Sequence, residues 1–288
     1  MNFLKLKARA KVNLSLDVLR KRPDGYHDVK MIMQTISLYD MISLEPIPKG
    51  IEVECECRWV PSDSENIAYK AAELLIREYR INSGIRIKIE KKIPVAAGLA
   101  GGSSDAAAVL KGMDILYNLN IGGSKIMSLG RCIGADVPFC LKGGTMLAEG
   151  VGEVLSELGP LPKVHIVLVK PKIGVSTAWV YKNLELGDIK ERPDTDLLIS
   201  AVKGREIDVI AKNMKNVLEY VTKKKYAVIG EIKEKLVRLG ALGSVMSGSG
   251  PAVFGVFKDK RAARRAFEAI KCDRWDCFLT ETINEEML

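Results

Sequence analysis

The chain contains 288 residues, 47% hydrophobic and 28% charged, a composition typical of a folded globular protein rather than a disordered or fibrous one. Lys and Arg outnumber Asp and Glu by 44 to 36, which gives a formal net charge of +8. This moderate excess suits an anionic small-molecule ligand. No basic tract with interleaved aromatic residues is present, so nucleic-acid binding is not expected.

The apolar runs of the sequence are short. The longest ones, such as residues 165–169, are far below the length that spans a bilayer. Lys5, Lys7 and Arg9 interrupt the first ten residues, which therefore lack the apolar stretch of a secretion signal. We expect a cytoplasmic protein that does not contact a membrane.

Short strands alternate with helices in the first half of the chain. Apolar and charged residues alternate from Ile51 to Trp59 and again from Ile85 to Ile89, the period of two typical of half-buried strands. Asp63-Ser64 is expected to cap the intervening helix. A glycine-rich stretch begins at Pro94, and from Ser104 apolar residues spaced by three or four predict a second helix.

A glycine and two prolines at residues 159–162 interrupt the pattern, and we predict a boundary there between domains 1–159 and 160–288. Beyond it, the sequence predicts a strand at 165–169, several helices, a hairpin closed by residues 247–250, an arginine-rich helix and a last strand. The predicted fold class is therefore α+β, with two domains and a ligand between them.

The most informative segment lies between the second strand and the second helix. It comprises Pro94, Val95, Ala96, Ala97, Gly98, Leu99, Ala100, Gly101, Gly102, Ser103 and Ser104. Small residues let the backbone approach a ligand closely, and the free N–H groups and dipole at a helix start attract phosphate. The two serine hydroxyls can contact a phosphate or a bound Mg²⁺. The alternative is an ordinary connector before a capped helix, which needs fewer small residues.

Common nucleotide-binding motifs do not describe this loop. The chain has no Gly-Lys pair, which excludes a Walker-type P-loop, and Gly248-x-Gly250 lacks the third glycine of the dinucleotide fingerprint. The protein-kinase signatures are absent as well.

Three motifs, in order along the chain, resemble the GHMP kinase superfamily of galactokinase, homoserine, mevalonate and phosphomevalonate kinases. They are residues 10–14 (Ala-Lys-Val-Asn-Leu), the glycine-rich loop, and residues 246–251 (Met-Ser-Gly-Ser-Gly-Pro). Residues 22–27 (Arg-Pro-Asp-Gly-Tyr-His), together with 101–107 and 134–139, are similar to the branch that phosphorylates a cytidine diphosphate-linked alcohol.

The resemblance implies a two-domain GHMP kinase fold, with the phosphate loop in the first domain, a ferredoxin-like second domain, and the active site in the cleft between them. It implies ATP and Mg²⁺ as cofactors and the C2 hydroxyl of a cytidine diphosphate-linked methylerythritol as acceptor, on the non-mevalonate route to isoprenoid precursors. Two alternatives remain, a homoserine or mevalonate-type kinase and a catalytically inactive sensor on the same fold. A monomer or weak homodimer is expected.

The resemblance also implies roles for single residues. Asp136 matches the base that takes the proton from the attacking hydroxyl, and Lys11 matches the lysine that orients this carboxylate and stabilises negative charge. Ser104 is the expected Mg²⁺ ligand. Asn66 matches a residue that touches adenine in relatives, although capping of the first helix would explain it too.

The expected substrate contacts are Asn13, Tyr26, His27, Tyr181, Gly248 and Ser249. Tyr26 offers a flat face on which a pyrimidine can stack, and His27 can hydrogen-bond the edge of cytosine. The alternative is a Pro-Asp-Gly turn flanked by a packed tyrosine and a surface histidine. Ala100 stands where many relatives have glycine, which costs little if its φ is negative.

Overall fold

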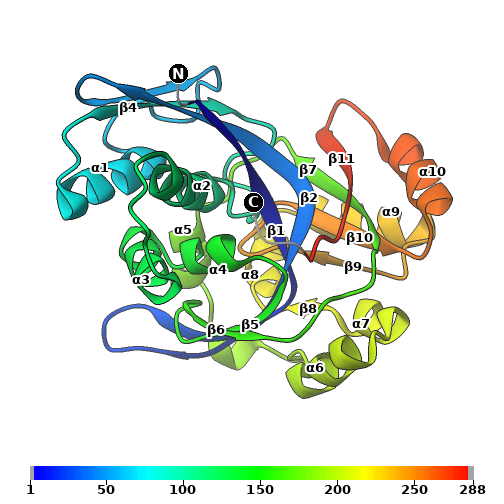
Figure 1. Ribbon diagram of the computed structural model, residues 1–288. Coiled ribbons are helices and arrows are strands. Elements are labelled where there is room, and N and C mark those ends of the chain that lie inside the picture. Colours follow the sequence, from blue (N-terminus) through cyan, green and yellow to red (C-terminus); the bar gives the residue numbers. More distant parts are fainter. Residues whose placement is uncertain (1–2, 285–288) are drawn as a thin grey trace.

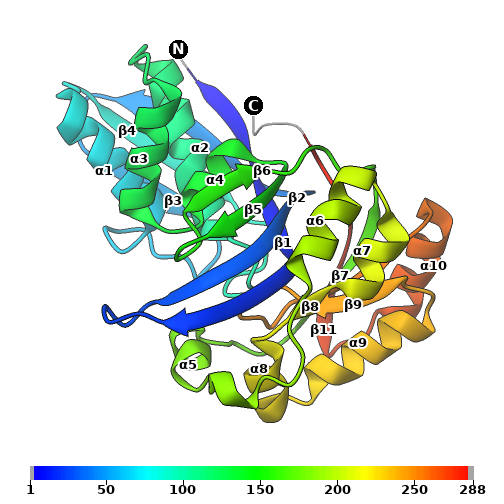
Figure 2. The same ribbon diagram turned by 90° about the horizontal axis from the view of Figure 1, so that it is seen from below.

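A long antiparallel hairpin runs through the middle of the molecule (Figures 1 and 2). The computed structural model describes residues 3–284, and its first two strands, β1 (Leu4–Lys21) and β2 (His27–Ile47), form this hairpin. Both faces are buried in the middle of β1. Ala10, Val12 and Leu14 belong to the same apolar cluster as the second sheet, so the alternating residues Lys11 and Asn13 lie on the opposite face.

The hairpin belongs to a seven-stranded sheet in which β3, β4, β2, β1 and β8 are neighbours, while β5 pairs with β2 and with β6. The other strands are β3 (Ile51–Cys55), β4 (Gly84–Glu90), β5 (Thr145–Glu149), β6 (Val154–Glu157) and β8 (Lys215–Asn216). The helices of this half are α1 (Ile67–Tyr79), α2 (Gly101–Leu116), α3 (Gly123–Ile133) and α4 (Val137–Lys142). Helix α2 contacts β1 and β2 and is itself in contact with α1, α3 and α4.

A four-stranded antiparallel sheet forms most of the second half, in the order β11-β7-β10-β9. Its strands are β7 (His165–Pro171), β9 (Gly243–Met246), β10 (Val253–Phe257) and β11 (Trp275–Glu281). The remaining helices are α5 (Thr177–Lys182), α6 (Thr195–Gly204), α7 (Ile207–Asn213), α8 (Glu219–Lys225), α9 (Val228–Arg238) and α10 (Lys260–Ile270). Helices α9 and α10 contact this sheet, and the strand order is that of a ferredoxin-like fold.

The change of sheet falls between β6 and β7, and we propose that the domains divide there, at residues 159 and 160. The second half also reaches back across this division. Strand β8 pairs with β1 through Lys215 and Asn216, and Thr282 forms an isolated bridge with Ile36. Within residues 3–284, no helix is both long and apolar enough to cross a membrane.

Three predicted element boundaries were wrong. The alternating strand ends at Cys55 because a turn follows, in which the Val60 N–H donates to the Cys57 carbonyl, and Trp59 is 69% exposed. Helix α1 is capped by Asn66, whose Oδ1 accepts from the N–H of Ala68 at 2.8 Å, and not by Asp63-Ser64. Helix α2 begins at Gly101, three residues before the predicted start, so the end of the glycine-rich segment is helical.

Candidate active site

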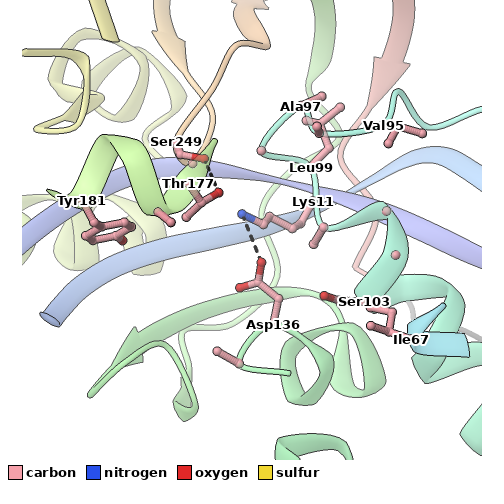
Figure 3. Close-up of a pocket in the computed structure, with 18 of the residues that line it drawn as sticks. Lys11, Ile67, Val95, Ala97, Leu99, Ser103, Asp136, Thr177, Tyr181 and Ser249 are labelled. Carbon is pink, nitrogen blue, oxygen red and sulfur yellow. Dashed lines mark hydrogen bonds and ion pairs between the residues drawn. The ribbon is translucent and has the colours of Figure 1, made fainter. Parts of the chain in front are cut away.

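A single cavity of about 1070 Å³ brings the three motifs together. Both halves of the chain line it, the first with the hairpin, the glycine-rich loop and the segment before α4, the second with α5 and the β9–β10 turn. Figure 3 shows Tyr181 on one side, Lys11 and Asp136 in the middle, and Val95, Ala97 and Ser103 on the other side. Every predicted site residue except Ser104 lines this cavity.

The glycine-rich loop has the backbone geometry of an anion site. Its φ angles are positive at Ala96, Gly98 and Ala100 (50°, 76° and 56°) and at none of the residues between them. Such alternation makes successive N–H groups converge on a concave surface that binds anions. Within residues 3–284, no N–H from Val95 to Ser103 donates to a protein acceptor. The N–H groups of the loop are therefore free for phosphate oxygens.

The carbonyl groups of this loop, in contrast, are held by the rest of the protein. Those of Ala97, Gly98 and Leu99 accept hydrogen bonds from the Ala252 N–H, the Ser247 hydroxyl and the Lys11 N–H, at 3.2, 2.9 and 3.2 Å. These bonds come from both other motifs. The loop is thus fixed with its acceptors turned to the protein and its donors left available.

Ala100 adopts the left-handed conformation. It is the N-cap of α2, with φ 56° and ψ 28°, where a Cβ atom is unfavourable by about 1–2 kcal/mol. The condition under which alanine would replace glycine at little cost, a negative φ, is therefore not met. The turn from loop to helix requires this conformation, so the alanine is retained under strain.

Lys11 and Asp136 meet at the centre of the cavity (Figure 3). The Lys11 Nζ lies 3.8 Å from Asp136 Oδ2 and donates to Asn13 Oδ1 at 2.7 Å. Asp136 is the N-cap residue of α4 and is followed by Val137 and Pro138, which fixes where its carboxylate leaves the backbone. The Lys11 side chain is 5% exposed and that of Asp136 is 31% exposed, so the carboxylate remains accessible to a ligand.

Asn13 holds the lysine in place. It is fully buried, and besides accepting from Lys11 it donates its backbone N–H to the Ser247 hydroxyl at 3.2 Å. Register shifts in the β1–β2 pairing occur between Arg9 and Lys11 and between Asn13 and Ser15. Such irregularities re-aim side chains along a strand.

Ser104 does not occupy the position expected of a magnesium ligand. Its side chain is fully buried, and its hydroxyl donates to the carbonyl of Arg9 and lies 3.3 Å from Cys140 Sγ. The reason is its position on α2, on the face that packs against β1. Ser103, one residue earlier, lines the cavity instead. Among the described residues, no group of three or more His, Cys, Asp or Glu side chains could hold a metal ion.

Aromatic side chains gather at the opposite end of the cavity. The rings of His27 and Tyr181 have centroids 5.2 Å apart and are tilted by 37°, although the two residues lie in different halves of the chain. Tyr26 lines the cavity at the tip of the hairpin and is 65% exposed.

Burial, and then the charge of Lys21, lower the pKa of His27, so this imidazole is neutral at pH 7. Gly248 and Ser249 lie in the β9–β10 turn, where Gly248 packs against Gly98 of the glycine-rich loop and the Ser249 hydroxyl lies 2.8 Å from that of Thr177.

A buried ionic cluster beside the glycine-rich loop was not predicted from the sequence. Lys91 donates to Asp40 at 2.5 Å and to Asp105 at 2.7 Å, and all three side chains are at most 8% exposed. Asp40 also accepts from the N–H groups of Lys92 and Ile93, whereas Oδ1 of Asp105 has no partner in the described part of the chain. Burial raises the pKa of Asp105 to about 8. Desolvation thus outweighs the attraction of Lys91 and favours the protonated form of Asp105.

Thr177 was also missed, and so were the lysines that line the cavity beside the predicted motifs. No local pattern distinguishes these residues from ordinary surface or helix-cap positions. They become recognisable only when distant segments of the chain are placed around one cavity.

Comparison with known proteins agrees with this geometry. Residues 66–144 match the family "GHMP kinases N terminal domain", and residues 198–277 match "GHMP kinases C terminal". A protein of Acetivibrio thermocellus named 4-diphosphocytidyl-2-C-methyl-D-erythritol kinase is 59% identical over 98% of this chain and all of its own length. One of Clostridium botulinum with the same name is 52% identical over 97% of this chain and all of its own.

A solved structure leads to the same assignment. The crystal structure of a 4-(cytidine 5'-diphospho)-2C-methyl-D-erythritol kinase superposes with a TM-score of 0.84 at 35% identity, covering 97% of this chain and 99% of that one. The similarity therefore extends through both halves of the chain and the cavity between them. The chain belongs to the GHMP kinase superfamily and, within it, to the 4-diphosphocytidyl-2-C-methyl-D-erythritol kinases.

Proposed function

We propose that this protein transfers the γ-phosphoryl group of ATP to the C2 hydroxyl of 4-diphosphocytidyl-2-C-methyl-D-erythritol, a step in the synthesis of isoprenoid precursors. One observation carries the proposal. The Lys11–Asp136 pair lies between a loop with free N–H groups and the aromatic pair of His27 and Tyr181, all in one cavity. This order matches a triphosphate, a reacting hydroxyl and a pyrimidine laid end to end.

In this mechanism Asp136 accepts the proton of the C2 hydroxyl as its oxygen attacks the γ-phosphorus. The bond from that phosphorus to the β–γ bridging oxygen breaks, and ADP leaves. Lys11 is held by Asn13 at 2.7 Å, so its charge is already in place when negative charge moves onto the transferring group. The loop contributes backbone N–H groups and, through α2, a helix dipole. Phosphoryl transfer requires mainly such positioning and charge stabilisation.

Mg²⁺ would neutralise charge on the phosphates when it is bound. We propose that it enters with ATP and is held mainly by phosphate oxygens, the usual mode for this cation. The donor set supports this, because no acidic cluster is found among residues 3–284 and the Ser104 hydroxyl is engaged by Arg9. The chain itself then provides anion-binding N–H groups rather than a dedicated metal site.

At the other end, Tyr26, His27 and Tyr181 would bind cytosine. A neutral imidazole has one donor and one acceptor, which suits the edge of a pyrimidine. Adenine would lie at the mouth of the loop near Asn66, whose side chain already caps α1. The residues of one chain form the proposed site, so a monomer or a weak homodimer would suffice for catalysis. The cytoplasm, where ATP is available, is the proposed location.

A coupled assay of ADP release tests the proposal, with the cytidyl substrate, mevalonate and homoserine supplied in parallel. We expect turnover with the cytidyl substrate alone. Turnover of mevalonate or homoserine at a comparable kcat/KM would assign the chain to a sister activity. Binding of the cytidyl substrate and ATP without any turnover would indicate a sensor.

A further inference from the structure

The charged side chains that line the cavity can be sorted by their partners. Its cations are Lys11, Lys21, Lys91 and Lys182, and its carboxylates belong to Glu65, Asp105 and Asp136. Lys11 is paired with Asp136, and Lys91 lies between Asp40 and Asp105. Within residues 3–284, neither Lys21 nor Lys182 has a carboxylate partner. Two cations without counter-ions therefore face this cavity.

Lys21 differs from the cations beside it. Arg20 forms an ion pair with Asp28, and Arg22 forms ion pairs with Asp24 and Asp28, so these two arginines stabilise the hairpin tip. Lys21 lies between them in sequence and is paired across the strands with His27. Because side chains alternate along a strand, Lys21 lies on the other face of β1 from Arg20. That face borders the cavity.

Lys182 reaches the same end of the cavity from the other half of the chain. It is the last residue of α5 and follows Tyr181, whose ring contacts His27. The contact between His27 and Tyr181 therefore brings both lysines to the aromatic end. Lys21 is the cross-strand partner of His27, and Lys182 is the sequence neighbour of Tyr181. Both are exposed.

We propose that Lys21 and Lys182 form a pair of cations that binds the diphosphate joining cytidine to the acceptor alcohol. The inference rests on the proposed function, which places cytosine at His27 and Tyr181 and the reacting hydroxyl at Asp136. A diphosphate between these two points carries negative charge that neither the aromatic rings nor Asp136 can neutralise. Since His27 is neutral at pH 7, the lysines are the groups that supply the positive charge.

This pair also explains how the site distinguishes its substrate from smaller alcohols. A substrate without a diphosphate gains nothing from the two lysines, whose positive charges then stay without a counter-ion. Ammonium groups on flexible stems suit a diphosphate, whose charge is spread over several oxygens. Lys21 and Lys182 are thus specificity-determining residues at the substrate end and play no part in binding ATP.

Binding of cytidine and of cytidine 5'-diphosphate, each measured by titration calorimetry, isolates the diphosphate contribution. The ratio of the two dissociation constants is compared for the unmodified protein, Lys21→Gln, Lys182→Gln and the double variant. We expect each single change to lower the preference for the diphosphate about three- to fivefold and the double change about tenfold or more, as for exposed charge pairs. Cytidine affinity and the KM for ATP should stay constant. Lys203→Gln, an exposed lysine on α6 outside the cavity, is the matched control for net charge.

Added salt provides an independent readout. Raising the salt concentration should reduce the diphosphate preference of the unmodified protein and leave that of the double variant nearly constant, because salt screens exposed charges. An unchanged preference in the double variant would overturn the inference, and so would equal losses for cytidine and its diphosphate. If the unmodified protein phosphorylates the cytidyl substrate but binds cytidine 5'-diphosphate no more tightly than cytidine, the role of the two lysines is overturned and the proposed function stands. An unmodified protein that neither turns over this substrate nor binds cytidine would remove the proposed function as well.

Discussion

The two ends of the cavity are built in different ways. The phosphate end is one contiguous segment of backbone, residues 94–103. Its N–H groups from Val95 to Ser103 are free, and three of its carbonyls accept hydrogen bonds from Lys11, Ser247 and Ala252. The aromatic end is assembled from side chains of the hairpin and of α5, which are far apart in sequence. A site made of backbone N–H groups depends on the φ angles of the loop and on how closely the ligand can approach it. A site made of side chains depends on how the two halves of the chain are placed relative to each other. Mutations should therefore act differently at the two ends.

The largest effect is expected where the two ends meet. Asp136→Asn keeps the size of the side chain but removes the proton acceptor, so kcat should fall by about a hundredfold to ten-thousandfold, the usual contribution of a general base. ATP affinity, measured by equilibrium binding, should change little. A variant that keeps most of its kcat would show that Asp136 is only a residue of the turn before α4.

At the phosphate end, Gly98→Ala should be severe. A Cβ at Gly98 would lie 2.1 Å from the carbonyl oxygen of Ser247, which is backbone and cannot move aside, and φ is 76°. We expect the KM for ATP to rise by about tenfold to a hundredfold, together with a loss of stability. Gly101→Ala is the matched control, because a Cβ there would meet only the Ile93 and Lys91 side chains, at 3.0 Å or more. Equal ATP affinities for the two variants, measured with circular dichroism on the same samples, would place the triphosphate elsewhere.

At the aromatic end, Tyr181→Ala should weaken the cytidyl substrate about tenfold to a hundredfold, since stacking of a base on a ring contributes about 1–3 kcal/mol. The KM for ATP should not change, because the phosphate loop is distant in the cavity (Figure 3). Tyr181→Phe keeps the ring and should behave like the unmodified protein. Parallel losses for ATP and substrate in Tyr181→Ala would show that the two ends are not independent.

The buried cluster next to the loop predicts a dependence of stability on pH. The folded-state pKa of Asp105, about 8, exceeds its ordinary value of 3.8, so the folded protein keeps this proton between these limits while the unfolded chain loses it. Stability is therefore lost as pH rises through that window. Asp105→Asn removes this loss of stability with rising pH. The free energy of unfolding of the variant, relative to that of the unmodified protein, should therefore be about 1–2 kcal/mol greater at pH 8 than at pH 5. Urea unfolding at the two pH values measures the difference, and parallel curves would contradict a protonated Asp105.

The smallest effect should come from Ala100→Gly. Relief of the positive φ of 56° should outweigh the greater freedom of glycine in the unfolded chain, for a net stabilisation of up to about 1 kcal/mol. Thermal unfolding, with Ala97→Gly at a residue of negative φ as control, tests the sign. A loss of stability at both positions would mean that the strain at Ala100 is negligible.

Sequence alone identified the features that lie within short segments. The glycine-rich loop was recognised because small residues before a helix carry their meaning locally, and Lys11 and Asp136 were recognised because the motifs around them resemble those of the GHMP kinases. The hairpin of β9 and β10 and the α+β class followed from periodicity in the same way. All of these reach the cavity or the sheets as predicted.

Tertiary structure decided what depends on direction and on distant neighbours. Successive helical residues point about 100° apart, so the packing of α2 against β1 determines that Ser104 is buried and Ser103 faces the cavity. The start of the same helix places Ala100 in a left-handed conformation. The raised pKa of Asp105 depends on its burial in the folded chain and on the charge of Asp40, against the opposing charge of Lys91, and the contact of His27 with Tyr181 joins two halves of the chain. Such relations arise only when burial brings separate segments together, because charge, solvation and distance are properties of the folded neighbourhood rather than of the residue.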